Sequence, residues 1–392
     1  MGKIIYADHS ATTYVKDEVI KEMLPYFTLN YGNPSSAYSI GRVSKEAVEK
    51  ARIKVAKAIG AESNEIYFTA GGSESDNMII KGIARANKTK GKHIITTKIE
   101  HLAVLNTCRE LEEEGFEVTY LDVDDKGFIN LDELKRNIRS DTILISVMFA
   151  NNEIGTIQPI KEIGEIAKKH NVLFHTDAVQ AAGNVPIDVK ELNVDLMSMS
   201  SHKIYGPKGI GALYIKTGTK LHSFVHGGAQ ERRRRAGTEN MQSIVGYGKA
   251  AELAKTNMDE HIERLTSLRT KLIDGILEKI PYTRVNGSLE NRLPGNVNFS
   301  FEFIEGEGIL LMLDMLGIAA SSGSACTSGS LDPSHVLMAI GLPHEIAHGS
   351  LRLSIGDFTT EEDIDYIIEK LPAVIERLRM MSPLYDAVTK QK

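Results

Sequence analysis

Lys203 stands where a lysine side chain could act as a nucleophile. It follows the apolar segment 195–199 and three polar residues, and it precedes a turn at 204–209 that contains glycine and proline. A lysine between a strand end and such a turn is placed where a lowered pKa makes it a Schiff-base nucleophile. Lys208 lies inside the turn, and we expect it to remain a solvated charge.

The chain has two cysteines, Cys108 and Cys326, which are too few for a disulfide framework or a multi-thiolate metal site. Cys108 lies among leucines in a segment that predicts an amphipathic helix, and we expect it to be a small buried hydrophobe. Cys326 lies within the small, polar segment 321–330, which offers little that could bury a sulfur atom. Exposed thiols of low pKa are the reactive ones, so the sequence predicts a functional Cys326.

Two further strand ends carry groups that could bind a ligand. Asp177 follows the apolar residues 172–174, and a carboxylate in such a setting needs a cationic partner, such as a protonated pyridine nitrogen, unless it simply caps a helix. Gly72 and Ser73 follow the segment 65–69 and open a helical pattern. Backbone N–H groups at such a helix start form an anion cradle, although Ser73 as an ordinary N-cap explains the same residues.

The elements that must position these residues are short apolar strands alternating with amphipathic helices. Strands are predicted at 65–69, 93–97, 117–121, 142–149, 172–175, 195–200 and 211–215, and helices at 74–86, 131–138 and 160–170. Alternating βα units with apolar strands indicate a mostly parallel sheet covered by helices on both faces. Ligands bind such sheets beyond the carboxyl ends of the strands, where the residues above lie.

A second, smaller α+β domain is predicted after the alternating units. A helical stretch at 258–280 is followed by a strand at 296–300, a helix at 307–316, a strand at 351–355 and a helix at 361–380. We expect residues 15–257 to form the large domain, and residues 1–14 with 258–392 to form the small one. No long linker separates them, so the two domains should pack closely.

The overall composition excludes several functional classes. Of 392 residues, 42% are hydrophobic and the net charge is -6, which gives no electrostatic reason to bind nucleic acid or an anionic membrane. No apolar run approaches the roughly 18 residues that cross a bilayer, and the first residues lack a secretory apolar core. We therefore expect a cytoplasmic protein.

Three segments resemble sequence motifs of other functional classes. Residues 344–348 match the zinc-protease pattern H-E-x-x-H, but Pro343 and Gly349 leave only a short turn, and no third ligand is evident. Residues 122–133 resemble an EF-hand loop, but Lys126 occupies a ligand position and a strand precedes it. Residues 232–235 are four arginines, which fit a phosphate site at a dimer interface, or a contact with a sulfur-accepting partner, better than nucleic acid.

The segments 175–180 (His-Thr-Asp-Ala-Val-Gln) and 200–203 (Ser-Ser-His-Lys) resemble the cofactor site of class V, fold-type I pyridoxal-phosphate (PLP) enzymes. More narrowly, the chain resembles cysteine desulfurases of the NifS/IscS type, from residues 8–13 to residues 349–354. The most specific part is 321–326 (Ser-Ser-Gly-Ser-Ala-Cys), which resembles the sulfur-carrying loop of that family. The resemblance implies the PLP-transferase fold type I, with a mostly parallel seven-stranded sheet between helices and a smaller α+β domain.

The resemblance also implies a role for each matching residue. Lys203 would hold the cofactor and move protons, and Asp177 would keep the pyridine nitrogen protonated. The other cofactor contacts would come from Gln180 to the phenolic oxygen, His101 stacked on the ring and active in proton transfer, Asn152, and a phosphate site of Gly72, Ser73, Ser200, His202 and Thr238 of the partner subunit. Asn33, Asn152 and Arg352 would grip the substrate, with Arg352 as a bidentate clamp on its carboxylate. Ser73 replaces a threonine that is common in the family, which is a conservative change.

The implied reaction converts L-cysteine to L-alanine and leaves a persulfide on Cys326. The implied partners are a second copy of the chain and an iron–sulfur scaffold or another sulfur acceptor. No resident metal is expected, and Cys326 would contact an iron–sulfur cluster only transiently during transfer. Three alternatives stay open at this point: a selenocysteine lyase, a class V aminotransferase on the same fold, and a zinc hydrolase.

Overall fold

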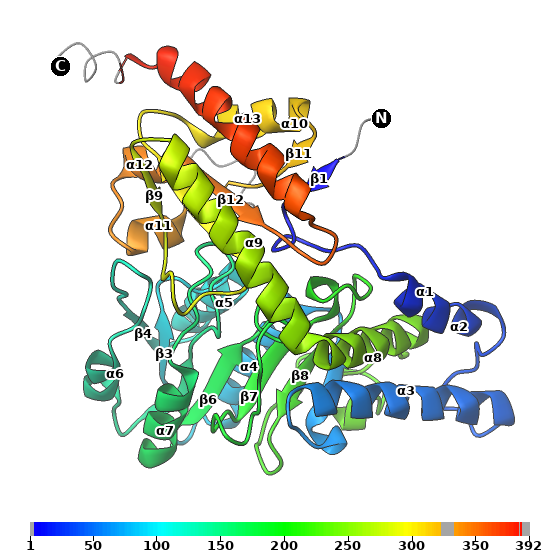
Figure 1. Cartoon of the computed structure of the whole chain (residues 1–392). Coiled ribbons are helices and arrows are strands. Elements are labelled where there is room, and N and C mark those ends of the chain that lie inside the picture. Colours follow the sequence, from blue (N-terminus) through cyan, green and yellow to red (C-terminus); the bar gives the residue numbers. More distant parts are fainter. Residues whose placement is uncertain (1–3, 323–332, 384, 386–392) are drawn as a thin grey trace.

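A computed structural model describes residues 4–322, 333–383 and 385 of the chain (Figure 1). Among these residues, the central sheet has seven strands in the order β2 (Ile66–Thr69), β8 (Gly211–Ile215), β7 (Leu196–Ser200), β6 (Leu173–Asp177), β5 (Thr142–Ser146), β3 (His93–Thr97) and β4 (Glu117–Leu121). β8 runs antiparallel to β2 and β7, and the remaining neighbours pair in parallel. The predicted mostly parallel, seven-stranded sheet is therefore confirmed.

Helices cover both faces of this sheet. One face packs on α3 (Ser39–Ala58), α7 (Ile160–His170) and α8 (Met241–Thr256), and the other packs on α4 (Gly72–Ala86) and α5 (Leu102–Glu113). Successive strand residues point to opposite faces, so Phe68 and Ile95 join the first core while Tyr67 and Ile94 join the second. This two-sided burial is why the strands read as continuous apolar runs.

A second unit lies beside the first, toward the top of Figure 1. It contains an antiparallel sheet of β9 (Thr283–Val285), β10 (Asn296–Phe301) and β12 (Ser350–Ser354), covered by α9 (Met258–Lys279), α10 (Gly306–Met315) and α13 (Glu361–Met380). The N-terminal strand β1 (Ile5–Tyr6) pairs with β11 (Ile318–Ala319) in this unit. The N-terminal segment thus packs with the C-terminal part of the chain, while the proposed division at residues 15 and 258 stays a prediction.

Shorter elements complete the described chain. They are α1 (Asp17–Met23), α2 (Pro25–Thr28), α6 (Leu131–Asn137), α11 (His335–Ala339), α12 (His344–His348) and the 3-10 turns η1 (Ser63–Glu65), η2 (Ser201–Lys203) and η3 (Glu231–Arg233). The zinc-like motif forms only the five-residue α12, and the described residues contain no group of three or more metal-ligating side chains. The EF-hand-like segment lies between β4 and α6, as the expected strand, turn and helix.

Two local predictions need correction. The strand predicted over 142–149 ends at Ser146, because β3 pairs with it only as far as Ile145 and the paired register with β6 ends at Ser146, although the amides of Val147 and Phe149 still donate to carbonyls of β6. Ser73 is not an N-cap: α4 begins at Gly72, and Gly71 precedes it with φ 155°. Ser73 therefore lies inside the first turn of α4.

Gly211 lets β8 approach the turn that starts α4. A Cβ atom on Gly211 would lie 2.7 Å from the Cα atom of Gly71 and 2.7 Å from the carbonyl oxygen of Met199. Both neighbours are backbone atoms that cannot rotate away. Any side chain at this position must therefore displace the start of α4.

We expect Gly211→Ala to destabilise the protein by about 1–3 kcal/mol through overpacking. Thermal unfolding of the purified protein checks this. Gly218→Ala is the control, since Gly218 has φ 93° and open space around it, so only the cost of a left-handed residue, about 1–2 kcal/mol, applies. Equal unfolding midpoints for Gly211→Ala and wild type would contradict the close packing.

Candidate active site

Polar side chains gather where the central strands end. Asp177 is the last residue of β6, and Lys203 follows β7 in η2. Asn152 follows β5, and His101 follows β3 as the N-cap of α5. The structure thus brings these four predicted residues to the carboxyl edge of the sheet, where α/β proteins bind their ligands.

The N-terminal segment folds over Lys203. The Nζ atom of Lys203 donates to the carbonyl oxygens of Ser10 and Ala11, the latter at 2.7 Å. The Nε2 atom of Gln180 donates to the same Ser10 carbonyl at 3.0 Å. Lys208 is exposed, as predicted, and donates to the carbonyl of Thr13. The lysine is therefore held by backbone carbonyls of the N-terminal segment.

Asp177 is a buried carboxylate that faces cations. Its side chain accepts a hydrogen bond from the amide of Val179 at 2.9 Å. Burial raises the pKa of Asp177, and the nearby His101 and Lys203 counteract that rise. Since an unpaired buried charge is costly, this carboxylate suits a cationic ligand such as a pyridinium nitrogen.

A second polar layer, which the sequence reasoning missed, lies beneath Asp177. His175 on β6 contacts Ser146 Oγ at 2.9 Å on one side and Ser198 Oγ at 3.1 Å on the other, and burial lowers its pKa to about 3. Asp76 of α4 has a buried Oδ1 atom without a hydrogen-bond partner, and burial together with Asp177 raises its pKa well above the usual range. Burial therefore keeps His175 neutral and favours the protonated form of Asp76, whereas Asp177 is the carboxylate that lies near the cationic groups of His101 and Lys203.

A second feature fits the phosphate of PLP. Ser200 on β7 pairs with Gly211 on β8, and Gly211 lies against Gly71, so the end of β7 meets the start of α4. Burial, with nearby Lys203 and Lys208, lowers the pKa of His202 to about 4, so the ring is a neutral hydrogen-bonding group. The start of a 15-residue helix and a buried serine are suited to bind an anion, and the cradle itself stays a prediction.

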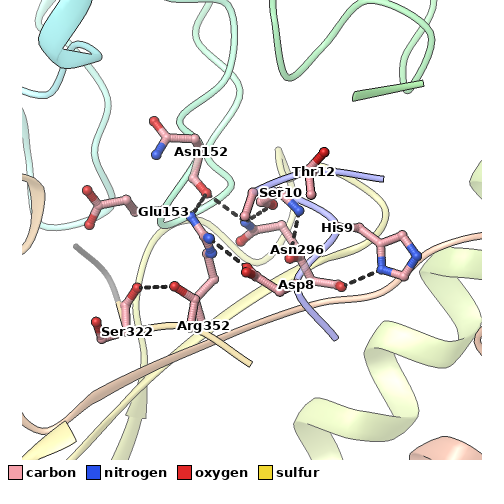
Figure 2. Close-up of polar contacts among 12 residues, drawn as sticks. Asp8, His9, Ser10, Thr12, Asn152, Glu153, Asn296, Ser322 and Arg352 are labelled. Carbon is pink, nitrogen blue, oxygen red and sulfur yellow. Dashed lines mark hydrogen bonds and ion pairs between the residues drawn. The ribbon is translucent and has the colours of Figure 1, made fainter. Parts of the chain in front are cut away.

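Arg352 lies where the two units meet (Figure 2). It is 2% exposed on β12, and its Nη2 atom pairs with Asp8 Oδ1 at 2.8 Å while Nη1 donates to the carbonyl of Asn152 at 3.2 Å. Its Nε atom is buried and has no hydrogen-bond partner among the residues that the structure describes. Asn296 of β10 reaches the same Asn152 carbonyl at 3.3 Å. A buried guanidinium with an unsatisfied donor is suited to bind a carboxylate.

Residues on both sides of the cysteine segment contact this site. Cys326 itself lies outside the described residues. Before it, Ser321 exchanges two backbone hydrogen bonds with Arg352, at 2.7 and 3.2 Å. After it, the Ser334 hydroxyl donates to the buried Glu153 carboxylate, and His335 Nε2 lies 3.0 Å from the carbonyl of Glu100. The chain therefore leaves and rejoins the described fold next to the candidate site.

Two buried acids beside predicted residues also escaped the sequence analysis. Glu100 precedes His101 and accepts from Thr97 Oγ1 and the amide of Met148, each at 2.8 Å. Burial raises its pKa to about 8, and burial raises that of Glu153, next to Asn152, to about 7. The only sign in the sequence that these two acids belong to the site was their position, since Glu100 directly precedes His101 and Glu153 directly follows Asn152.

Two predicted residues lie away from this cluster. Asn33 sits in the loop after α2, where its Oδ1 atom accepts from the amide of Ser35 at 2.9 Å. Thr238 is exposed on the loop before α8, which agrees with a role at another subunit without testing it.

Three of the four consecutive arginines make contacts within the chain. Arg232 and Arg234 lie over the ring of Tyr67, with centroid distances of 5.0 and 5.2 Å. Arg235 pairs with Glu74, in the first turn of α4, at 2.9 Å. The pair with Glu74 ties the segment to the start of α4 and neutralises the charge of Arg235, while the contacts with Tyr67 hold Arg232 and Arg234 against the large unit without neutralising them.

Comparison with known proteins gives one family over nearly the whole chain. Residues 5–367 match the class-V aminotransferase family. A protein named cysteine desulfurase IscS from Clostridium botulinum (strain Hall) is 62% identical over 394 residues, which cover 100% of this chain and 99% of that protein. One with the same name from Methanosarcina thermophila is 63% identical, with 98% and 95% covered.

Solved structures of similar proteins superpose on most of this chain. A NifS-like protein superposes with a TM-score of 0.90 at 40% identity and covers 96% of this chain and 100% of its own. A protein described as SspA in complex with cysteine superposes with a TM-score of 0.81 at 37% identity, over 91% and 100% of the two chains.

The buried acid Glu100 predicts a pH-dependent stability. Its pKa rises from 4.5 to about 8 on folding, so the folded chain binds more protons between these values, and stability falls as pH rises through this window. Glu100→Gln cannot ionise and removes this loss. We expect the variant to be more stable than wild type at pH 8 by more than about 1 kcal/mol, and the difference to vanish near pH 4.5.

Thermal unfolding across pH 4.5 to 8.5 measures this difference. The control is Glu113→Gln, on the exposed side of α5. A pH profile of Glu100→Gln that parallels wild type would show that Glu100 is ionised in the folded protein.

Proposed function

The chain belongs to the class-V aminotransferase family and is a cysteine desulfurase, and we propose that Lys203 and Cys326 divide its reaction between them. Its cofactor is PLP and its substrate is L-cysteine. Lys203 serves the cofactor side of the reaction, and Cys326 receives the sulfur. The observation that carries this division is that the chain on both sides of Cys326 is hydrogen-bonded to site residues, through Ser321 to Arg352 and through Ser334 to Glu153.

When bound, PLP supplies an electron sink that stabilises negative charge at the substrate α-carbon. Asp177 holds the ring nitrogen protonated, and Gln180 orients the phenolic oxygen. The phosphate is held by Gly72, Ser73, Ser200 and His202, with Thr238 of the partner subunit. The buried Asp177 and the cradle at the start of α4 support this assignment, because they offer the charge and the donors that the cofactor requires.

Lys203 would hold the cofactor through its amine, and the same amine would move the proton at the substrate α-carbon. His101 is suited to the second proton transfer. Its Nδ1 atom accepts from the amide of Ala103 at 3.1 Å, which places the proton of the neutral ring on Nε2. Fixing the tautomer in this way leaves the Nε2–H group to donate a hydrogen bond at the active site.

Substrate binds at the meeting of the two units. Arg352 takes the α-carboxylate with its unsatisfied Nε edge, while Asp8 neutralises the other side of the guanidinium. The side chains of Asn152 and Asn33 complete the contacts, although Asn33 must come closer than it lies here. Closure of the domain seam, or a second subunit, would supply that approach.

The sulfur step balances without another reactant. The Cys326 thiolate attacks the substrate sulfur, the C–S bond breaks and an S–S bond forms. The bonding pair of the C–S bond stays with the substrate β-carbon, which takes up a proton. The products are L-alanine and a persulfide on Cys326, which passes its outer sulfur to an acceptor such as an iron–sulfur scaffold or another thio-cofactor system.

A homodimer is the proposed assembly. The side chains of α1, α2 and the start of α3 expose a group of large apolar residues: Ile20, Leu24, Phe27, Leu29, Tyr31, Tyr38, Ile40 and Val43, each at least 40% exposed. Figure 1 places these helices together at the right-hand side of the molecule, beside α8. Apolar surface of this kind marks protein interfaces. A second copy covering it would bring Thr238 toward the partner's cofactor.

The compartment proposed for this reaction is the reducing cytoplasm, because Cys326 must return to a thiol after each transfer. In the part of the chain that the structure describes, no helix has the length and apolar character to span a membrane.

Cys326→Ala is the decisive test of the proposed division. We expect the variant to lose sulfide release from L-cysteine while it keeps the absorption of the bound cofactor. Thiol titration gives a second readout, because Cys108 is fully buried and burial raises its pKa to about 12. Wild type should therefore show one fast-reacting thiol and the variant none.

Normal desulfuration by Cys326→Ala would overturn the persulfide mechanism and favour a lyase that acts without this thiol. Lys203→Ala is the matched variant on the cofactor side. It should lose the visible absorption of the cofactor while Cys326 still reacts with thiol reagents.

Arg352→Lys tests the carboxylate clamp. A lysine keeps the charge but cannot form two parallel hydrogen bonds, so we expect KM for L-cysteine to rise roughly 10- to 100-fold. The affinity for PLP should not change, and titration of the apoprotein with PLP serves as the control. An unchanged KM would remove Arg352 from the substrate site.

A further inference from the structure

Residues 231–233 form a left-handed turn from residues that carry side chains. The φ angles of Glu231, Arg232 and Arg233 are 45°, 54° and 66°. Left-handed backbone is unfavourable for residues with a Cβ atom, and three in succession persist only where the surroundings hold them. Strain of this kind is a reason to look for a function of the turn.

The side chain of Glu231 fixes this turn to the rest of the subunit. Its buried carboxylate accepts two parallel hydrogen bonds from Arg52 of α3, at 2.8 and 2.9 Å, and a third from the amide of Phe68 at 2.8 Å. The Arg52 guanidinium also lies 4.8 Å from the centre of the Phe68 ring. A buried, bidentate pair of this type fixes orientation as well as position.

The chain beyond the turn is then directed outward. The amide of Ala236 donates to the carbonyl of Val225 at 3.3 Å, and the amide of Gly237 donates to Gln230 Oε1 at 3.1 Å. Thr238 follows directly and is exposed. The turn thus sets where Thr238 lies relative to the rest of the subunit.

We propose that Glu231, held by Arg52, is a positioning residue that aims Thr238 at the cofactor phosphate in a second copy of this chain. The inference rests on the proposed homodimer and on the proposed phosphate contact of Thr238. Glu231 touches neither substrate nor cofactor, and it acts through the direction of residues 236–238. In a two-fold symmetric pair, each subunit would complete the site of the other.

The test is a double-mutant cycle on PLP binding. Apoproteins of wild type, Glu231→Gln, Thr238→Val and the double variant are titrated with PLP, and sedimentation confirms that each is a dimer. Loss of a hydrogen bond to a charged group corresponds to about tenfold weaker binding. We expect about this factor for each single variant and for the double variant, since residues that act through one contact are not additive.

The outcomes separate this inference from the function on which it rests. If Thr238→Val weakens PLP binding and Glu231→Gln does not, the positioning role is wrong and the phosphate contact stands. If Thr238→Val has no effect, the phosphate contact falls, and the positioning role falls with it. If the double variant binds about a hundredfold more weakly than wild type, Glu231 acts independently of Thr238, which also overturns the proposal.

Two further variants distinguish a specific effect on PLP binding from a general loss of folding. Arg52→Lys keeps the charge but not the paired hydrogen bonds, so it should weaken PLP binding in the same direction. Lys54→Met, on the same helix, removes the ion pair with Glu252 of α8 and should leave PLP binding unchanged. Tryptic cleavage after the arginines at 232–235 in the apoproteins reports on the turn without cofactor, and it should be faster in Glu231→Gln than in Lys54→Met.

Discussion

The arrangement of the site depends on one buried carboxylate. Asp177 ends a central strand, and burial lowers the pKa of His175 and raises that of Asp76 in the layer below it. A buried anion is tolerated only with a cation nearby. His101 and Lys203 lie close enough to counteract the effect of burial on Asp177. In the proposed function, a protonated pyridine nitrogen would add to these cations, so Asp177 would bind the ring end of the cofactor and the start of α4 the phosphate end.

The second constraint is the meeting of the two units around Arg352. Its guanidinium belongs to the small sheet, yet it contacts Asp8 near the N-terminus and the Asn152 carbonyl of the large unit. Asp357 adds a second link across the same seam by pairing with Lys16, and His261 of α9 pairs with Asp357 and also contacts Asn184 of the large unit. In the proposed function, substrate binding would thus be coupled to the relative position of the units, because the clamp and the cofactor lysine come from different sides.

The fold was largely predictable because strong local signals coincide with the tertiary structure. α7 and α13 have the predicted bounds, and α13 begins with a capping box at Thr360. Lys203 and Asp177 were found by their positions after strands, which the sheet topology makes meaningful. Asp76 and His175 were missed, because a polar residue inside an amphipathic helix or a strand gives no sign of what it faces.

Contacts between segments that are distant in the chain could also not be predicted from the sequence. Asp8 and Arg352 are 344 residues apart, and nothing local identifies one as the counter-ion of the other. The run of arginines at 232–235 was expected to serve a phosphate site at a dimer interface or a contact with a sulfur-accepting partner, and three of its members contact Tyr67, Glu74 and backbone carbonyls of their own chain. A run of arginines is compatible both with a binding surface and with contacts that hold the segment to its own subunit, so charge alone could not decide between the two.

Burial also determines the reactivity of the thiol of Cys108. Cys108 lies in the core between α4, α5 and the sheet, and burial raises its pKa to about 12, so it forms almost no thiolate at neutral pH. A second reactive thiol near a persulfide would exchange with it and lose the sulfur to the wrong residue. Sulfur transfer through one cysteine therefore requires the other to be inert. The apolar packing around Cys108 serves the chemistry as well as the fold.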